Sequence, residues 1–456
     1  MQPKKANGNT GGGAPVDTAE AEVLPLVSDP GAKPASSARR SEWYHSAFII
    51  MAEVMGMGLL GLPHAMAQLG WVIGVSSCVL FGVLSIYSML LLSRTQNEIF
   101  PDAQSYAEMA RLTFGPTFAV VTRVIVLTSW ALILVYFLLA CAESVNIALP
   151  NLPLSISQLV PLVGVVLLVP LQFRSLYQVA WLSLASSIAV VLAVVFIVVA
   201  LSQEDYDDAH LGNGSVPHTH RHSVWPTGGG VIDLFGHMAS FIFAYMGHSV
   251  VFEIMREMRD PNDFSRAALS SNTFMICVYV GTSTLGYAAY GADVAGYLPD
   301  SMRAGPAKRV VGALLTLHTA VAYMVVAQPL HRAYHGFFLS ETLDKPSSMQ
   351  HPKAALHWLL ICTCQMVFSA VFAIVVPFFA DLQGLIGSLT GALIMFGYPA
   401  LFFLRAHQLH GAPVGWADTL LCSLFLYIFT PAFLVLGTMS SVKQIVLDWE
   451  AADGQW

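Results

Sequence analysis

The first apolar stretch of the chain is long enough to cross a membrane, yet glycine interrupts its middle. Residues 45–71 are apolar and of helical character on both sides of Gly56, Gly58 and Gly61, and Pro63 removes a further backbone donor. This pattern predicts a helix that is broken near its centre. Backbone groups freed inside a membrane are tolerated where they line a protein cavity, so the break predicts a binding site within the bilayer.

Composition places the chain among proteins that cross a membrane several times. Of its 456 residues, 55% are hydrophobic and 11% are charged, and the mean hydropathy is +0.63. A water-soluble globular protein does not have this composition. The six cysteines lie in apolar segments, where neither a disulfide framework nor a metal site is expected: Cys78, Cys141, Cys277, Cys362, Cys364 and Cys422.

Eleven apolar segments follow an amino-terminal tail. The tail, residues 1–42, is rich in Gly, Pro, Ala and Ser and is expected to be disordered and cytoplasmic. The predicted membrane domain covers residues 43–442, and residues 443–456 are expected to be a short outward tail. Each segment is long enough, or nearly so, to cross a bilayer: residues 45–70, 72–93, 117–148, 157–173, 177–201, 231–255, 267–290, 307–339, 354–379, 382–404 and 417–442.

Lysine and arginine are distributed unevenly between the two sides of these segments. With a cytoplasmic amino terminus, 16 of the 21 lie on the inner side, which is the usual bias of membrane proteins. The outward loop at residues 203–230 holds a glycosylation sequon at Asn213. A solvated polar loop is favoured over a metal or proton sensor for its histidines: His210, His218, His220 and His222.

The sixth segment is interrupted in the same way as the first. Residues 244–248, Ala-Tyr-Met-Gly-His, place a glycine and a histidine among apolar neighbours. By helical rise, His248 lies about 12 Å from the inner end at Arg256, and Glu53 lies about 13 Å from Tyr44. Both side chains therefore approach the middle of a roughly 30 Å hydrocarbon core.

The two interrupted segments are the first members of two successive sets of five. The sets cover about residues 45–201 and 231–404, and an extra segment follows at 417–442. Glycine-interrupted segments in corresponding positions predict an all-α polytopic membrane protein built from an inverted repeat, with its site near the bilayer midplane.

Three motifs carry a resemblance to a known family. Residues 56–71, GMGLLGLPHAMAQLGW, resemble the first span of the amino acid/auxin permease family, residues 243–261 its sixth, and residues 376–399 its tenth. The resemblance implies a LeuT-like five-plus-five fold with an eleventh span and broken first and sixth helices. It also implies secondary transport of amino acids or related compounds, usually driven by protons. The chain departs from the family at His64, where Tyr is frequent, and at Glu53, where a small or neutral residue is usual.

The two breaks predict how a zwitterionic substrate is held. Backbone N–H groups freed at the first break can bind the carboxylate, assisted by a helix dipole. Carbonyl groups of Ala244 and Tyr245 can accept from the amine, while Phe243 and Tyr245 bound the side-chain pocket. Tight helix packing is the alternative explanation of the glycines. The predicted substrate site comprises Met55, Gly56, Met57, Gly58, Phe243, Ala244, Tyr245, Gly247 and His248.

Glu53 is the first candidate for the group that couples transport to protons, because an ionisable side chain inside a membrane is costly and usually functional. His248, which titrates near neutrality, is the second. A structural role is the alternative for each, and sodium remains an alternative coupling ion.

Glu253 and Arg256, three residues apart, are expected to pair. Four further side chains are better explained as helix caps or interhelical hydrogen bonds: Glu143, His237, His318 and Asp381.

These features together predict a proton-coupled symporter of neutral amino acids that works by alternating access. A sensor of the same fold and an auxin-like organic acid carrier are the alternatives. An enzyme is disfavoured because no HExxH or GxSxG motif lies at membrane depth. No cofactor and no nucleic-acid partner are expected. The plasma membrane and a vacuolar or lysosomal membrane are both compatible with the sequence, and the oligomeric state is left open.

Overall fold

The computed structural model describes residues 41–172, 180–210, 221–226, 230–338 and 352–451. Over these residues the chain is helical, and its one β-bridge joins Ser41 to Met258. Most of the predicted tail, at residues 1–40, lies outside the described residues, as do Asn213, His218 and His220.

The end of the first predicted segment and the whole of the second lie in one long helix, which turns sharply at a glycine. Helix α1 covers Trp43–Val54, a short 3-10 turn η1 covers Met57–Gly61, and α2 covers Leu62–Glu98. Within α2, Gly70 has φ +72°, and a Cβ placed there would lie 2.8 Å from the backbone of Trp225. The left-handed conformation and this close approach both require glycine. The turn falls between the predicted segments 45–70 and 72–93.

A short helix that the apolar pattern did not predict precedes the third long one. Helix α3 covers Tyr106–Phe114, and its N-cap Ser105 accepts from the Glu108 amide. It is followed by α4 at Pro116–Ala148, α5 at Ile156–Leu168 with the turn η2 at Pro170–Gln172, and α6 at Ala180–His210. Because α3 is short and only partly apolar, a search for membrane-length segments passes over it.

The next part of the chain begins with a second interrupted helix. Helix α7 covers Val231–Ala244, the turn η4 covers His248–Val250, and α8 covers Val251–Glu257. The elements that follow are η5 Pro261–Asp263, α9 Phe264–Tyr290, η6 Gly291–Asp293, α10 Leu298–Ser301, α11 Pro306–Phe338 and, after the last gap, α12 Pro352–Val375.

Two helical stretches with π-type turns complete the chain. The first contains α13 Phe379–Ile386, η8 Gly387–Gly391, η9 Leu393–Gly397 and α14 Tyr398–His410. The second contains α15 Trp416–Leu424, η10 Phe425–Phe429, α16 Thr430–Ala432, η11 Phe433–Gly437 and α17 Thr438–Ala451.

The predicted short outward tail, residues 443–456, is helical over the part that the structure describes. Helix α17 continues to Ala451. Lys443 Nζ lies 2.9 Å from both carboxylate oxygens of Asp233 on α7, and Trp449 Nε1 donates to the Val375 carbonyl over 2.6 Å. These contacts give the helix a packing surface, which the sequence pattern did not reveal.

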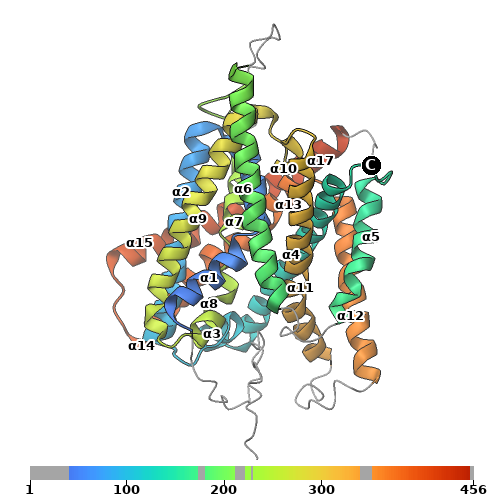
Figure 1. The fold of residues 1–456 in the computed structure, drawn as a ribbon. Helices are drawn as coiled ribbons and strands as arrows, with labels where there is room; N and C mark the ends of the chain where they lie inside the picture. Colours follow the sequence, from blue (N-terminus) through green and yellow to red (C-terminus); the bar gives the residue numbers. More distant parts are fainter. Residues whose placement is uncertain (1–40, 173–179, 211–220, 227–229, 339–351, 452–456) are drawn as a thin grey trace, which may run out of the picture.

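Seven helical stretches among the described residues are long and apolar enough to cross a membrane, and two shorter apolar helices accompany them at Ile156–Gln172 and Ala185–Leu201. In Figure 1, α3 and α8 lie near the bottom of the bundle, and α10 and α17 lie near the top. We refer to these as the α3 end and the α10 end. Helices α6 and α12 leave many apolar side chains exposed, and so does α1, whereas α7 and α13 are largely buried. The second interrupted helix therefore lies inside the bundle.

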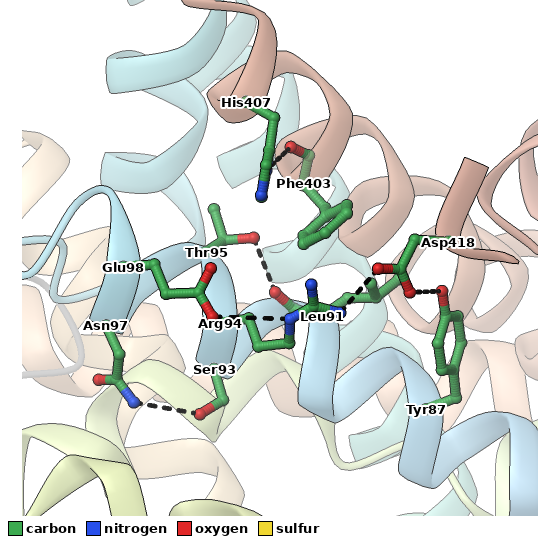
Figure 2. A network of polar contacts seen from close by, with 10 residues as sticks. All are labelled: Tyr87, Leu91, Ser93, Arg94, Thr95, Asn97, Glu98, Phe403, His407 and Asp418. Carbon is green, nitrogen blue, oxygen red and sulfur yellow. Dashed lines mark hydrogen bonds and ion pairs between the residues drawn. The ribbon is translucent and has the colours of Figure 1, made fainter. Parts of the chain in front are cut away.

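A polar network ties the last helical stretch to the rest of the bundle (Figure 2). Arg94 on α2 lies 3.0 Å from a carboxylate oxygen of Asp418 on α15, and the Tyr87 hydroxyl donates to the same carboxylate over 2.9 Å. The Arg94 guanidinium also lies 4.7 Å from the ring centre of Phe403 on α14. One arginine thus joins three helices.

Candidate functional site

The two helix breaks lie directly against each other. A Cβ on Gly58 would lie 3.1 Å from the Ala244 Cα atom, and a Cβ on Gly247 would overlap the Val54 side chain. Each break therefore supplies a glycine at the point where the end of the other helix approaches. The glycines allow tight packing as well as interruption of the helices, so the two explanations of these residues do not compete.

A cavity of about 70 Å³ lies between the breaks. Its lining comes from α1 and η1, from α4, from the α7–η4 break and from α11. Five of the predicted site residues line it: Glu53, Gly56, Gly58, Phe243 and Gly247. The structure therefore brings residues nearly 200 positions apart to one space.

Glu53 faces this cavity. Its side chain, near the end of α1, is exposed instead of packed into the core. None of the ion pairs between described residues includes Glu53. Among the described residues that line the cavity, Glu53 alone carries a formal charge. A carboxyl group in this position can exchange a proton with the contents of the cavity.

His248 and Tyr245 point away from the cavity, towards α2. The Nε2 atom of His248 lies 2.6 Å from the Ser88 hydroxyl oxygen and 3.3 Å from the Ser85 carbonyl oxygen, and the side chain is fully buried. The Tyr245 hydroxyl lies 3.7 Å from the Cys78 sulfur. Both side chains therefore hold the second break against α2. Met55 and Ala244 are likewise absent from the described lining of the cavity, and the side chain of Met57 lies outside the described part of the chain.

Tyr279 on α9 joins the ends of the two broken helices and was not predicted. Its hydroxyl lies 3.2 Å from the carbonyl oxygen of Val54 and 3.1 Å from that of Ala244. The Tyr245 carbonyl accepts from the Ser85 hydroxyl over 3.4 Å. The two carbonyl groups predicted to receive a substrate amine thus already have donors. The Ala244 carbonyl keeps one further lone pair, whereas the Tyr245 carbonyl already accepts twice, because the Gly247 N–H also donates to it over 3.0 Å.

Gln383 on α13 links both breaks to α4. Its amide nitrogen donates to the Gly58 carbonyl over 2.8 Å and to the Ser240 carbonyl over 3.1 Å. Its amide oxygen accepts from the Tyr136 hydroxyl over 3.3 Å. The side chain is fully buried, and a Cβ on Gly61 would overlap its oxygen. Gln383 lies inside the third family motif, but nothing in its neighbours along the sequence identifies these partners.

His318 on α11 lies beside the first break. Its Nδ1 atom is 3.0 Å from the Ser186 hydroxyl oxygen on α6, which is the interhelical hydrogen bond predicted for this residue. Its Nε2 atom is buried without a hydrogen-bond partner. A Cβ on Gly56 would lie 3.5 Å from that nitrogen, so the ring faces the interrupted backbone.

The described residues contain no group of three or more His, Cys, Asp or Glu side chains that is arranged to hold a metal ion. His222, from the polar loop, is held by the Tyr287 and Ala288 carbonyl groups, at 3.1 and 3.0 Å from its Nε2 atom.

Comparison with known proteins identifies the family of this chain. The model of a family described as transmembrane amino acid transporter protein matches residues 39–444. The chain belongs to this family. It is therefore an amino acid transporter of the membrane and not an enzyme, as the three sequence motifs predicted.

Relatives from Arabidopsis thaliana match over nearly their whole length. Amino acid transporter AVT3C is 24% identical over 421 residues, which cover 87% of this chain and 89% of the relative. Amino acid permease 2 is 23% identical over 450 residues, covering 89% and 88%. Lysine histidine transporter-like 1 is 21% identical over 453 residues, covering 91% and 90%.

A solved structure shares the fold. The substrate-bound, outward-open state of a Na+-coupled sialic acid symporter superposes with a TM-score of 0.51 at 13% identity, over 90% of this chain and 89% of the other. This similarity confirms the prediction of an all-helical polytopic membrane protein with a LeuT-like fold.

Proposed function

We propose that this chain is a proton-coupled symporter of neutral amino acids, with its substrate site in the cavity between the two breaks. The observation that carries the proposal is the composition of that cavity. It is bounded by both interrupted helices, and Glu53 is the one formal charge among the described residues around it. An apolar lining with a single carboxyl group suits a substrate whose side chain has no charge.

The proposed substrate contacts follow from the breaks. The carboxylate of the substrate is held by backbone N–H groups freed near Gly56 and Gly58, which face the cavity. The amine is held by the remaining lone pair of the Ala244 carbonyl group, and at the Tyr245 carbonyl it replaces the longer of the two present hydrogen bonds, the one from the Ser85 hydroxyl at 3.4 Å. Phe243 bounds the pocket for the substrate side chain. The remaining predicted site residues, Met55, Met57, Gly247 and His248, shape the two breaks.

The proposed topology has eleven spans in a five-plus-five inverted repeat, with the amino terminus in the cytoplasm. In Figure 1, α1 lies in the lower half of the bundle and α17 near the top. An odd number of spans agrees with this arrangement. In this topology the α3 end faces the cytoplasm, and the α10 end faces either the exterior or the lumen of an acidic organelle.

Uptake into vesicles tests the proposal. Purified protein in proteoliposomes should accumulate a labelled neutral amino acid when the compartment on the α10 side is acidic. A protonophore should abolish the accumulation, and replacement of sodium by choline should leave it unchanged. Uptake that follows sodium alone would refute proton coupling. Binding without flux would identify a sensor, and flux of indole acids alone would identify an organic acid carrier.

The substitution Glu53→Gln tests the role assigned to Glu53. It keeps the shape of the side chain and removes its proton exchange, so substrate should still bind and exchange while pH-driven accumulation falls at least tenfold. When proton and substrate bind cooperatively, each raises the affinity for the other by the same factor. Wild-type affinity should therefore weaken from pH 5 to pH 8, and that of the variant should stay nearly constant. An unchanged pH dependence in Glu53→Gln would exclude this residue.

A further inference from the structure

A second cavity, of about 40 Å³, lies between the substrate site and the α3 end. It is bounded by Tyr106 of α3, by Arg123 and Trp130 of α4, and by Ser249 and Glu253 of the η4–α8 segment. A water molecule needs about 10–15 Å³ of such space, so the cavity has room for roughly three. The lining is mostly apolar, but the polar side chains of Arg123, Ser249 and Glu253 give such water molecules hydrogen-bond partners.

Glu253 is the buried acid of this second cavity. Its side chain is 3% exposed, and its Oε2 atom has no hydrogen-bond partner. The predicted pairing with Arg256 is absent from the ion pairs of the described residues, because Arg256 donates instead to the Gln104 amide oxygen over 3.2 Å. A buried carboxylate without a partner is costly, and a bound proton removes that cost.

The groups around Glu253 permit a change of protonation. Arg123 lines the same cavity from α4, and Arg256 lies one turn further along α8. The Tyr106 hydroxyl donates to the Ile394 carbonyl over 3.0 Å, and its ring lies 6.1 Å from that of Tyr398. Arg256 thus stabilises the ionised form, while the buried, largely neutral surroundings favour the protonated form.

Only two side chains separate this cavity from the substrate site among the described lining residues. Trp130 and Ser249 line both spaces, and the Trp130 indole N–H donates to the Ser249 hydroxyl over 3.4 Å. A hydrogen bond this long is weak. Glu53 and Glu253 therefore lie in adjacent cavities on either side of one thin partition.

We propose that Glu253 is a second proton-binding group, which passes the transported proton to the α3 side. This inference rests on the proposed proton-coupled transport and extends it. In the release step, the O–H bond of the Glu253 carboxyl group breaks, and its proton binds to a water molecule of the second cavity. The hydronium ion leaves towards the α3 end, and the carboxylate remains in the cavity that Arg123 also lines. Glu53 loads the proton with the substrate, and Glu253 releases it.

The test separates the pH on the two sides of the membrane. Wild type, Glu253→Gln, Glu253→Asp and the control Glu257→Gln are compared in vesicles of one known orientation, with the pH on the α3 side varied from 5.5 to 8. Glu257 is a half-buried acid on the same short helix that does not line the described part of either cavity. Wild type and Glu257→Gln should slow as the α3-side pH falls, because proton release is opposed.

Glu253→Gln should lower the maximal rate of pH-driven uptake about tenfold and remove its dependence on the α3-side pH. Its KM and its substrate exchange under equal pH should stay near wild type, and Glu253→Asp should restore the pH dependence. If Glu253→Gln keeps the wild-type dependence on α3-side pH, the role of Glu253 is refuted, but the proposed function is not. An equal fall in exchange and in driven uptake also refutes this role, because it indicates a structural effect. Wild type without proton-driven uptake overturns the proposed function as well.

Discussion

The substrate cavity is closed very differently towards the two ends of the molecule. Towards the α10 end, the ring of Tyr136 packs 4.5 Å from that of Phe379, and Gln383 bonds both breaks to Tyr136. Towards the α3 end, the described lining residues that the two cavities share are Trp130 and Ser249, which are joined by one long hydrogen bond. In this conformation the α10 closure is thick and the α3 closure is thin.

One helix supplies both closures. Trp130 and Tyr136 are six residues apart on α4, which places them about 9 Å apart along its axis. A small movement of the broken helices relative to α4 therefore affects the two closures in opposite ways. Fewer contacts have to break at the α3 end, so this conformation is closer to releasing substrate there than at the α10 end.

The largest effect should come from Gln383→Ala. It removes three hydrogen bonds and leaves the Gly58 and Ser240 carbonyl groups without this donor, which should weaken the α10 closure by about 2 kcal/mol, or roughly 30-fold. A cysteine placed at Ile133, which lines the cavity, should then react much faster with an impermeant thiol reagent added at the α10 end.

The matched control is Gln365→Ala. Gln365 is also a buried glutamine, but it donates to Ala131 and Ser369 and does not line the described part of the cavity. It should change labelling little at equal amounts of folded protein. Equal labelling in the two variants would show that Gln383 does not hold the α10 closure.

An intermediate effect is expected for Gly61→Ala. The new methyl group would overlap the Gln383 amide oxygen and displace a flexible side chain, at a cost of about 1 kcal/mol. Labelling at the α10 end should rise by about fivefold. In the double variant with Gln383→Ala, the Gly61→Ala change should add no further cost, because the Gln383 amide oxygen that its methyl group would overlap has been removed. Gly281→Ala, where the described structure leaves open space, is the control. Additive effects would contradict the predicted overlap.

The smallest effect should come from Trp130→Phe. It keeps a ring in the partition and removes one weak hydrogen bond, worth about 0.5 kcal/mol. Efflux of preloaded substrate towards the α3 end should accelerate about twofold, with α10-side labelling unchanged. Trp358→Phe removes an indole N–H that donates to the Leu171 carbonyl over 3.0 Å away from both cavities, and it should have no effect on efflux. A slower efflux in Trp130→Phe would mean that the α3 closure is not limiting.

The glycine pattern predicted much of the fold, because it acts locally. Gly56, Gly58 and Gly247 mark the places where the helices are interrupted, and Gly70 marks the turn between two segments. Interruption and turning depend on the backbone of a few neighbouring residues, which periodicity and composition can detect. The family resemblance supplied the LeuT-like arrangement that local patterns lack.

The residues that join the breaks could not be predicted in this way. Tyr279 and Gln383 are single polar side chains in apolar helices, and the partners of Tyr279 lie 225 and 35 residues away. Nothing nearby in the sequence distinguishes them from core residues. The position of His248 could be predicted only in part. Its depth in the membrane follows from the sequence, but the direction of its side chain depends on how η4 turns after Gly247.

The Tyr279 hydroxyl affects how easily the two broken helices can move relative to each other. It has one proton and lies at almost equal distance from two carbonyl oxygens, those of Val54 and Ala244. If α1 moves away, the proton can bond fully to Ala244, and if α7 moves away, it can bond fully to Val54. The number of hydrogen bonds made by this hydroxyl is then the same before and after the movement. The two broken helices can therefore move relative to each other at Tyr279 without a large energetic cost from this hydroxyl group.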